Sequence, residues 1–584
     1  MARRGGVLLS SGSLFVAVLA AVYAFSDLRY GTARQGGEDM ALVFEVRDRI
    51  HSDYVDQVDS LRVIEAGIDG MLDVLPQSEV LPLEQNWGES RPGDSAQRRR
   101  FVEAFEKLES SLGGTVSLDS LVRGSIWGML AALDPHSGYL DASDYEDMVE
   151  RFRGDFEGIG IYFEVRDGKL LVIAPIFGSP SHGKLRAGDH IAEIDGISTL
   201  GISDEEVMDK LRGARGSRVR VGVARQGRAG LLHYEIRRDR VTIRSVPYAY
   251  MLTPDVGYVR MVRFAETTAD ELDDALDSLR VQGMRSLVLD LRDNGGGLLD
   301  QAVEVADFFL DAGQLIVYTE GRDGDRQKYR ARNQLDASLP LVILINRGSA
   351  SASEIVAGAV QDLDMGLVAG ETSFGKGLVQ GQFPLRSNGG LLLLTVARYY
   401  TPLGRLIQRP YTDDVHAYYE EGIEGIDPNS ADSLNVGKSV FYTALGRRVY
   451  GGGGITPDVM LPAEEYSEFA VEFLSQGHLA DFCGYWVGLH SDWPAAFSDY
   501  LYGYEVDGQT VQAWEDFVLD KMPTVSDSTL AVHRTFTRNQ LKAGFARVLW
   551  GEEEYYRVYL QTDKQLEAAL AHIANAAELV ARRY

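Results

Sequence analysis

The sequence predicts a multidomain α/β protein with a helical N-terminal region, a small β-domain, an α/β core with a mixed or parallel sheet, and a helical C-terminal extension. Three observations favour this fold class. The chain has 584 residues, enough for about four domains of ~150 residues. Its pattern changes from helical to short strands near Phe156, and strands alternate with helices from Val256 to about Gln408. Such alternation is typical of parallel strands covered by helices.

Composition narrows the class of protein further. Hydrophobic residues make up 45% of the chain, which excludes disordered and collagen-like classes. There are 58 Lys and Arg against 86 Asp and Glu, a net charge of −28 that argues against nucleic acid as a partner. The single cysteine, Cys483, allows no intramolecular disulfide, and no Cys/His cluster has zinc-ligand spacing. We therefore expect neither a metal nor another cofactor.

The start of the chain predicts export. Arg3 and Arg4 precede an almost uncharged stretch whose apolar centre runs from Leu14 to Ala24. Residues 1–25 are either a cleaved signal peptide or, through residues 7–25, a membrane anchor, and the pattern leaves both open. In either case the positive flank stays in the cytoplasm and the remainder is exported. We expect a periplasmic protein of a bacterial cell envelope, which is either released or anchored to the inner membrane.

Helical periodicity predicts an N-terminal domain over residues 38–144. Within it Val63–Leu75 resembles Leu121–Leu133, which indicates either a duplicated hairpin or a chance similarity. The polar stretch Pro76–Arg100 between them is predicted to be a loop.

The next domain, residues 145–242, has short strands. Asp167-Gly168 between two of them is typical of a hairpin turn. A lone helix begins after Ser203, which forms a capping box with Glu206, and closes at Gly213.

The α/β core follows over residues 243–462. A strand near Val256–Phe264, a helix over Thr268–Arg280 and a strand over Ser286–Leu291 show its alternation. Residues 463–584 read mainly as amphipathic helix, including one helix over Lys564–Arg583.

A candidate nucleophile follows the apolar strand Leu341–Ile345. Ser351 stands where a helix through Asp362 begins. Free amides and the positive end of the helix dipole can stabilise there an oxyanion that forms when a serine attacks a carbonyl. The alternative is that Ser349, Ser351 and Ser353 only cap the helix.

A candidate base lies 25 residues further on, at Lys376 within a glycine-bracketed stretch. Burial lowers the pKa of a lysine, so that a neutral amine can accept the hydroxyl proton. A surface lysine in a turn is the alternative. Ser351 lacks the Gly-x-Ser-x-Gly surroundings of the usual hydrolase triad.

A glycine turn ends the strand that contains Asp290. The run continues through Asn294 to Gly297, and its glycines let backbone amides approach a ligand closely. Such a turn could donate to the same oxyanion, or it could be only a turn.

Together these stretches resemble the carboxyl-terminal processing proteases, also called tail-specific proteases. The resemblance rests on four motifs: Gly348–Ile355, Phe374–Gly377, Asp290–Gly297 and Leu133–Leu140. It covers roughly residues 39–75 and 116–410 and resumes at Gly454–Pro457.

The resemblance implies roles for individual residues. Ser351 would be the nucleophile, Lys376 the general base and Gln380 the group that orients the lysine. The oxyanion donors would be the amide of Ala352 and that of Gly296 or Gly297. Glu354 and Asp362 also match family positions, and we interpret both as charges that support their helix.

The resemblance also makes residues 145–242 a PDZ module. Its loop for a peptide carboxylate would be Gly158-Ile159-Gly160-Ile161, with the peptide added as a strand. Ser181 and Gly183 replace alanines that are usual in the family. Arg212 would either contact the core when peptide is bound or be a solvated helix end.

Two stretches depart from the family pattern: an insertion over about residues 409–453 and the C-terminal residues 463–584. The resemblance implies an exported Ser/Lys serine endopeptidase that recognises protein C-termini, needs no cofactor and can form homodimers. The alternative function is a catalytically inactive PDZ scaffold that binds peptides in the cell envelope.

Overall fold

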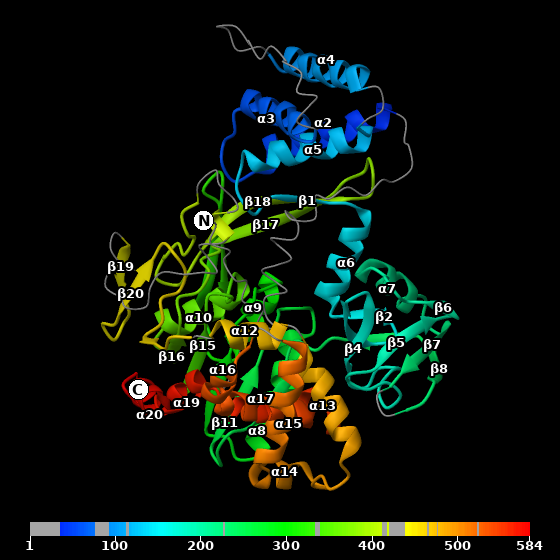
Figure 1. Cartoon of the computed structure of the whole chain (residues 1–584). Helices are drawn as coiled ribbons and strands as arrows, with labels where there is room; N and C mark the ends of the chain where they lie inside the picture. The colour runs from blue at the N-terminus through cyan, green and yellow to red at the C-terminus, as the bar shows by residue number, and fades with distance from the viewer. Residues whose placement is uncertain are drawn as a thin grey trace. The chain divides into compact units, whose positions relative to one another are not determined.

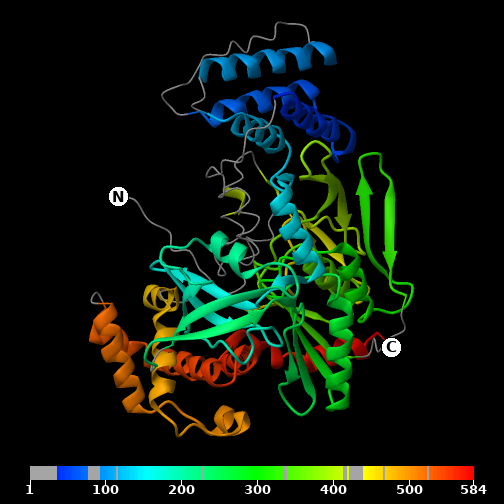
Figure 2. The same ribbon diagram turned by 90° about the vertical axis from the view of Figure 1, so that its right-hand side faces the viewer.

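The computed structural model of the chain is shown from two sides in Figures 1 and 2. It describes residues 36–75, 93–112, 116–225, 228–332, 339–411, 417–419, 438–463, 467–475, 477–522 and 525–583. The described residues divide into two compact units: one joins Arg153–Tyr248 to Ala463–Ala571, and the other contains the rest. The predicted signal peptide or anchor, residues 1–25, lies outside the described residues.

The helical N-terminal region, drawn in blue in Figure 1, is part of the second unit. Its helices are α2 (Gly36–Asp53), α3 (Ser60–Asp73), α4 (Asp94–Leu112) and α5 (Leu118–Ala131). The two similar stretches of sequence are α3 and α5, which pack against each other. Their backbones meet at glycines, since a Cβ on Gly128 would lie 2.1 Å from the carbonyl oxygen of Ala66. Both stretches contain the run Gly-Met-Leu, at Gly70 and at Gly128, and this run lies at the helix crossing.

The prediction of a loop over Pro76–Arg100 is wrong from Asp94 onward, where α4 begins. Residues 76–92 lie outside the described residues. The apolar stripe of α4 consists of Phe101, Phe105 and Leu108, all buried in the N-terminal core. The stripe lies after the polar first turns, so the polarity of those turns concealed the helix.

The main sheet of the second unit has the order β10-β11-β12-β15-β16-β21. Its strands are β10 (Tyr248–Met251), β11 (Val256–Arg260), β12 (Ser286–Asp290), β15 (Leu341–Ile345), β16 (Leu367–Gly370) and β21 (Val459–Met460). From β11 to β21 each pair is parallel. The helices of this layer are α8 (Thr268–Val281), α9 (Leu299–Asp307), α10 (Ala352–Asp362) and α20 (Ile573–Ala581). The predicted α/β core is confirmed.

A second sheet of this unit is antiparallel and brings the N-terminal region to the core. In it β1 (Gly138–Leu140) pairs with β18 (Leu391–Tyr400). Its other strands are β13 (Leu315–Gly321), β14 (Arg326–Arg330) and β17 (Leu378–Pro384). A hairpin of β19 (Ser439–Tyr442) and β20 (Arg448–Gly451) lies within the predicted insertion. Helix α6 (Ala142–Arg153) leads out of this unit.

The first unit contains the predicted small β-domain. Its strands are β2 (Asp155–Gly158), β3 (Ile161–Arg166), β4 (Lys169–Pro175), β5 (His190–Ile194), β6 (Ile197–Ser198), β7 (Arg218–Ala224), β8 (Leu231–Arg237) and β9 (Asp239–Thr242). The sheet has β3 at one edge. Asp167 and Gly168, with φ of 51° and 70°, form the predicted turn. The one helix among its described residues, α7 (Asp204–Leu211), begins with the predicted capping box of Ser203 and Glu206.

The same unit includes the predicted helical C-terminal part. Its helices are α12 (Glu468–Ser475), α13 (His478–Leu489), α14 (Phe497–Gly503), α15 (Gly508–Lys521), α16 (Asp527–Val532), α17 (Arg534–Leu549), α18 (Glu552–Leu560) and α19 (Lys564–Leu570). An aromatic core that includes Phe473, Phe482 and Trp514 holds α12 to α18 together. None of the described helices is both long and apolar enough to cross a membrane.

The prediction of a single helix over Lys564–Arg583 is wrong. The chain forms α19 and α20 with a turn at Ala571 and His572 between them. The two helices belong to different units, although a single apolar pattern runs through both of them. Neither glycine nor proline marks the break, which is why periodicity alone did not reveal it.

Candidate active site

Ser351 lies between β15 and α10, as the sequence predicts. The five residues of β15 are apolar and buried, and α10 begins at the following residue, Ala352. Ser351 has a φ of 54° and a ψ of −112°. The other described non-glycine residues with positive φ are all aspartates, a residue type that tolerates this region: Asp167, Asp195, Asp293 and Asp364. Ser351 therefore has a strained backbone, which is typical of functional sites.

Lys376 lies just before β17, and its residue is only 7% exposed. Its Nζ donates a hydrogen bond of 2.8 Å to Oε1 of Gln380. Burial lowers the pKa of Lys376 to about 8, although the carboxylates of Asp134 and Glu354 act in the opposite direction. A neutral amine at this position is therefore accessible near neutral pH.

The carboxylate of Glu354 connects the backbones of Ser351 and Lys376. Its Oε2 accepts from the amide of Ser351 at 2.8 Å and from that of Lys376 at 2.9 Å. Its Oε1 accepts from the hydroxyl of Ser373 at 2.5 Å and from the amide of Gly375 at 2.7 Å. Burial raises the pKa of Glu354 to about 7 even though these four donors lower it. Glu354 therefore does more than support its helix.

Tyr399 makes a second connection between the same two residues. Its hydroxyl lies within hydrogen-bond distance of the carbonyl oxygens of both Ser351 and Lys376, at 3.2 Å for Ser351, and its single proton is shared between them. The tyrosine is 2% exposed and lies on β18, which also pairs with β17 beside the lysine. Two side chains thus fix the separation of the two backbones.

The glycine turn after β12 lies against Ser351. A Cβ on Gly296 would come within 2.9 Å of both the amide nitrogen of Ala352 and the Cβ of Ser351, so only glycine fits there. The amide of Gly296 already donates to Oδ1 of Asn294 at 3.0 Å. Within the described part of the chain the amides of Gly297 and Ala352 have no such acceptor. Of the three candidate amides, these two are therefore available to donate to an oxyanion.

Buried ion pairs hold this turn in place. Asp290 is fully buried, and its carboxylate pairs with Arg260 at 2.8 Å and with Arg292 at 2.6 Å. Burial alone would raise the pKa of Asp290, but the two guanidinium groups and the hydroxyl of Tyr258 outweigh it and lower the pKa. The carboxylate stays ionised, so it holds the turn across the whole physiological pH range.

Asp362, at the other end of α10, pairs with Arg405 at 2.6 Å, and both side chains are fully buried. Its Oδ2 also accepts from the amide of Leu403 at 2.9 Å. The interaction ties α10 to the segment after β18, which agrees with a structural role. Arg405 also donates to Gln361 at 3.0 Å.

The predicted carboxylate loop, Gly158–Ile161, lies in the first unit. The side chains of Ile159 and Ile161 are buried in its core. The carbonyl of Ile159 accepts from the amide of Ser181, and the carbonyl of Gly160 accepts from the amide of Ile176, both at 3.0 Å. The N–H of a trans peptide points opposite to its carbonyl, so the amides of Gly160 and Ile161 point away from this turn.

Arg212 follows α7 and stacks on a neighbouring ring of the same unit. Its guanidinium lies 5.3 Å from the centroid of Phe156. Arg212 is therefore more than a solvated helix end, and its contact with the core when peptide is bound stays a prediction.

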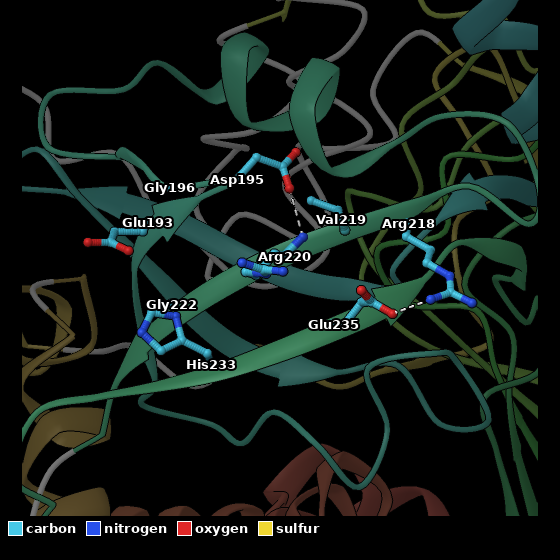
Figure 3. A pocket seen from close by; sticks show the side chains of 9 residues that line it. All are labelled: Glu193, Asp195, Gly196, Arg218, Val219, Arg220, Gly222, His233 and Glu235. Carbon is cyan, nitrogen blue, oxygen red and sulfur yellow. Dashed lines mark hydrogen bonds and ion pairs between the residues drawn. The ribbon is translucent and has the colours of Figure 1, made fainter.

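Figure 3 shows a hollow on the outer face of β5, β7 and β8, also in the first unit. In it Arg218 pairs with Glu235 at 2.6 Å, and the backbone amide of Arg220 donates to Asp195 at 2.8 Å. None of the predicted site residues lines it. Among the described residues no three His, Cys, Asp or Glu are grouped to hold a metal ion.

The structure thus gathers Ser351, Ala352, Gly296, Lys376 and Gln380 into one site. Sequence reasoning missed three contributors. Tyr399 has no motif of its own, and Asp134 and His136 belong to the Leu133–Leu140 motif, to which we assigned no role. His136 accepts a hydrogen bond from Nε2 of Gln380 through its backbone carbonyl, a contact that no side-chain pattern can reveal.

Two stretches of the chain match families of known proteins. Residues 255–417 match peptidase family S41, and residues 158–234 match the PDZ domain. A carboxy-terminal-processing protease of Bartonella bacilliformis is 40% identical over 319 residues, which are 53% of this chain and 73% of that protein. Carboxy-terminal processing protease CtpA of Bacillus subtilis is 36% identical over 312 residues, covering 53% and 66%.

Among solved structures, the photosystem II D1 C-terminal processing protease is similar at 27% identity. The match covers 76% of this chain and 97% of that one, with a TM-score of 0.36. The sequence relationship to the Bartonella protease, which spans nearly three quarters of that protein, establishes the family. The chain belongs to peptidase family S41, as a carboxy-terminal processing protease with a PDZ domain.

Proposed function

We propose that the chain is an exported endopeptidase in which Ser351 is the nucleophile, Lys376 is the general base and Gln380 orients the lysine. One observation carries the proposal: Ser351 and Lys376 are joined through both their amides and their carbonyls, by Glu354 and Tyr399. A strained backbone at a serine and a buried lysine both cost stability. Their occurrence together therefore favours a functional role over a structural one.

The reaction follows from the chemistry of these groups. Neutral Lys376 accepts the proton of the Ser351 hydroxyl while Oγ bonds to the scissile carbonyl carbon. The amides of Ala352 and Gly297 donate to the oxyanion that forms. The lysine then passes its proton to the leaving amine as the C–N bond breaks, which leaves an acyl-enzyme. Water, deprotonated by the lysine, releases the acyl group and restores the serine. No cofactor takes part.

The pKa of Lys376 suits this task. With a pKa of about 8, roughly a tenth of the lysine is neutral at pH 7, against less than about a thousandth for an unperturbed lysine. Gln380 accepts one N–H of the amine at 2.8 Å, which directs the remaining lone pair elsewhere. That lone pair is then free for the serine proton.

The PDZ domain is the proposed receptor for substrate C-termini. The amides of Gly160 and Ile161 point away from the 176–181 turn and can donate to a terminal carboxylate. Strand β3 starts at Ile161 and is at the edge of its sheet, so a peptide can be added alongside it. Specific binding of a C-terminus needs both features.

Export is proposed from the sequence. Arg3, Arg4 and the apolar run Leu14–Ala24 support a periplasmic location, either after cleavage or with residues 7–25 as an anchor. A homodimer is also part of this proposal. Separation of membranes from soluble periplasm, followed by detection of the chain, distinguishes anchoring from release.

The test of the catalytic proposal compares the full chain with its Ser351→Ala and Lys376→Ala variants. The substrate is an unstructured protein with an apolar C-terminus. We expect cleavage by the unmodified chain and none by either variant. Cleavage that survives both substitutions would overturn the site. Binding of the C-terminal peptide without any cleavage would favour the inactive scaffold.

A further inference from the structure

The predicted insertion after Gln408 contributes two buried tyrosines beside the active site. Tyr418 and Tyr419 are 3% and 5% exposed and form a cluster with Ala350 and Phe374. Ala350 precedes the proposed nucleophile, and Phe374 lies two residues before Lys376. Both tyrosine rings also meet the ring of His136 edge to face, with centroids 5.5 and 6.1 Å away. The ring of His136 is therefore packed against both tyrosines of this segment.

Hydrogen bonds fix the orientation of the His136 ring. Burial lowers the pKa of His136 well below its usual value, helped by the charges of Lys376 and Arg409, so the ring is neutral. The hydroxyl of Tyr419 donates to the carbonyl of Pro135 at 2.7 Å, which leaves its oxygen to accept from Nδ1 at 3.4 Å. The hydroxyl of Tyr418 then donates to Nε2 at 3.1 Å. Both ring nitrogens have a partner.

The backbone of His136 sets the direction of the Gln380 amide. Its carbonyl accepts from Nε2 of Gln380, so the other end of that amide, Oε1, must face Lys376. A rotated amide would place two donors against the lysine, which also has only donors when protonated. A displaced His136 would therefore release the group that orients the base.

A second route leads from Tyr418 to the same lysine. The side chain of Gln408 donates through Nε2 to the hydroxyl of Tyr418 at 3.1 Å. Its Oε1 accepts from the amide of Gly377, the residue after Lys376, at 2.8 Å. Tyr418 thus acts on the side chain of the lysine through His136 and Gln380, and on its backbone through Gln408.

We propose that Tyr418 and Tyr419, together with His136, are positioning residues that hold Gln380 and Lys376 in the geometry for proton transfer from Ser351. None of the three bonds to Ser351 or to the lysine amine itself. The inference rests on the proposed Ser/Lys mechanism and extends it to a segment that lies in an insertion relative to the family pattern.

The hydroxyl groups and the rings of the two tyrosines have separable effects. The hydroxyls orient His136, so their loss should misplace the lysine without exposing it. The rings pack against His136 and Phe374, near the lysine in the fold, so their loss should also admit water and restore solvation of the amine. The charged groups that act on Lys376 are the carboxylates of Asp134 and Glu354, while His136 is neutral and is affected by the charge of Arg409.

The experiment uses the full chain and an internally quenched peptide with an apolar C-terminal residue. The first variant combines Tyr418→Phe with Tyr419→Phe, and the second combines Tyr418→Ala with Tyr419→Ala. Tyr318→Phe is the matched control, because Tyr318 stacks on Tyr400, 4.9 Å between centroids, and takes no part in this network. For each protein kcat and KM are measured from pH 6 to pH 10, and near-ultraviolet circular dichroism verifies the fold.

For the double Phe variant we expect kcat to fall about tenfold or more, KM to change by less than about twofold, and the acidic limb of the profile to stay in place. For the double Ala variant we expect a larger fall and an acidic limb that moves to higher pH. The Tyr318→Phe control should match the unmodified chain. If the double Phe variant does not fold, the single Tyr418→Phe variant replaces it with the same expectation.

Two results would overturn the inference: a folded Phe variant with unchanged kcat, or one in which only KM rises. Ser351→Ala and Lys376→Ala measured in parallel separate the two levels of argument. If both are inactive while the Phe variant keeps full activity, the inference fails and the Ser/Lys mechanism stands. If either retains cleavage, the mechanism itself fails.

Discussion

The amides of Ser351 and Lys376 donate to the same carboxylate oxygen, Oε2 of Glu354, at 2.8 and 2.9 Å. The residues are 25 positions apart and come from different elements, a helix start and a strand start. A shared acceptor fixes their backbones more tightly than packing alone, because a displacement of either residue breaks a charge-assisted hydrogen bond. Pre-organisation of a nucleophile and its base is what proton transfer between them requires.

The Glu354→Gln substitution should abolish most activity and destabilise the chain. An amide has only one acceptor oxygen, so its NH2 would face two of the four donors that the carboxylate now satisfies. Unfolding free energy should fall by about 2 kcal/mol or more, and kcat roughly tenfold or more. Denaturant titration and peptide cleavage measure the two effects. Glu304→Gln, at an exposed position on α9, is the control and should change neither.

The Tyr399→Phe substitution should lower kcat much more than it lowers the stability of the fold. It removes the hydroxyl that bridges the carbonyls of Ser351 and Lys376 and keeps the ring, which is buried. We expect a loss of about 1 kcal/mol of stability but a fall in kcat of about tenfold with KM unchanged. Tyr400→Phe, one residue along β18, is the control. Equal kcat for both variants would show that the hydroxyl is dispensable.

Much of this arrangement could be predicted from local sequence. An apolar run followed by small polar residues and a helical pattern places Ser351 at a strand-to-helix turn, and the turn of Asp167 and Gly168 was equally evident. Such features depend on neighbours in sequence, and their chemistry is local. The helix in which Glu354 lies was predicted in the same way.

What the sequence concealed depends on tertiary packing. Glu354 looked like a charge that supports its helix, because its partners Ser373, Gly375 and Lys376 become neighbours only when β16 and α10 pack together. Tyr399 and His136 act through backbone carbonyls, for which no residue type is diagnostic. The break between α19 and α20 was hidden for a different reason, since both helices keep one apolar period while packing into different units.

The buried pair of Asp362 and Arg405 should be necessary for folding and not for chemistry. Asp362→Asn leaves a fully buried guanidinium without its counter-charge, which should cost about 3–5 kcal/mol. Asp277→Asn, in an exposed pair with Arg280, should cost less than about 1 kcal/mol. The double change Asp362→Leu with Arg405→Met removes both charges and should recover part of the loss. Thermal unfolding of the four proteins tests this order.

The Gly128→Ala substitution should disrupt the crossing of α3 and α5. The added methyl would lie 2.1 Å from the carbonyl oxygen of Ala66, so the helices must separate. Overpacking of this kind should cost about 1–3 kcal/mol. Gly484→Ala, also in a helix, is the control, because no atom of a neighbouring element lies within 4 Å of the added methyl. This variant should be more stable than the unmodified chain by up to about 1 kcal/mol. Equal melting temperatures for the two variants would contradict the close crossing.

The pH dependence of cleavage should report both buried groups at once. Lys376 acts as a base only when neutral, and its pKa of about 8 makes kcat/KM rise with pH up to that value. Glu354 accepts its four hydrogen bonds only when ionised, and its pKa of about 7 adds a second requirement of the same sign. Activity must therefore increase with pH through both ionisations and level off above about pH 8.

The shape of that profile is specific. Below about pH 7 the logarithm of kcat/KM should rise with a slope approaching two, and between about 7 and 8 with a slope near one. A profile measured with a peptide that has no ionisable side chain excludes titration of the substrate. A single ionisation near pH 8 would mean that Glu354 stays charged throughout and serves only as a fixed anchor. A rate that falls as pH rises from 6 to 8 would exclude a lysine base, because protonation of Lys376 cannot favour removal of the Ser351 proton.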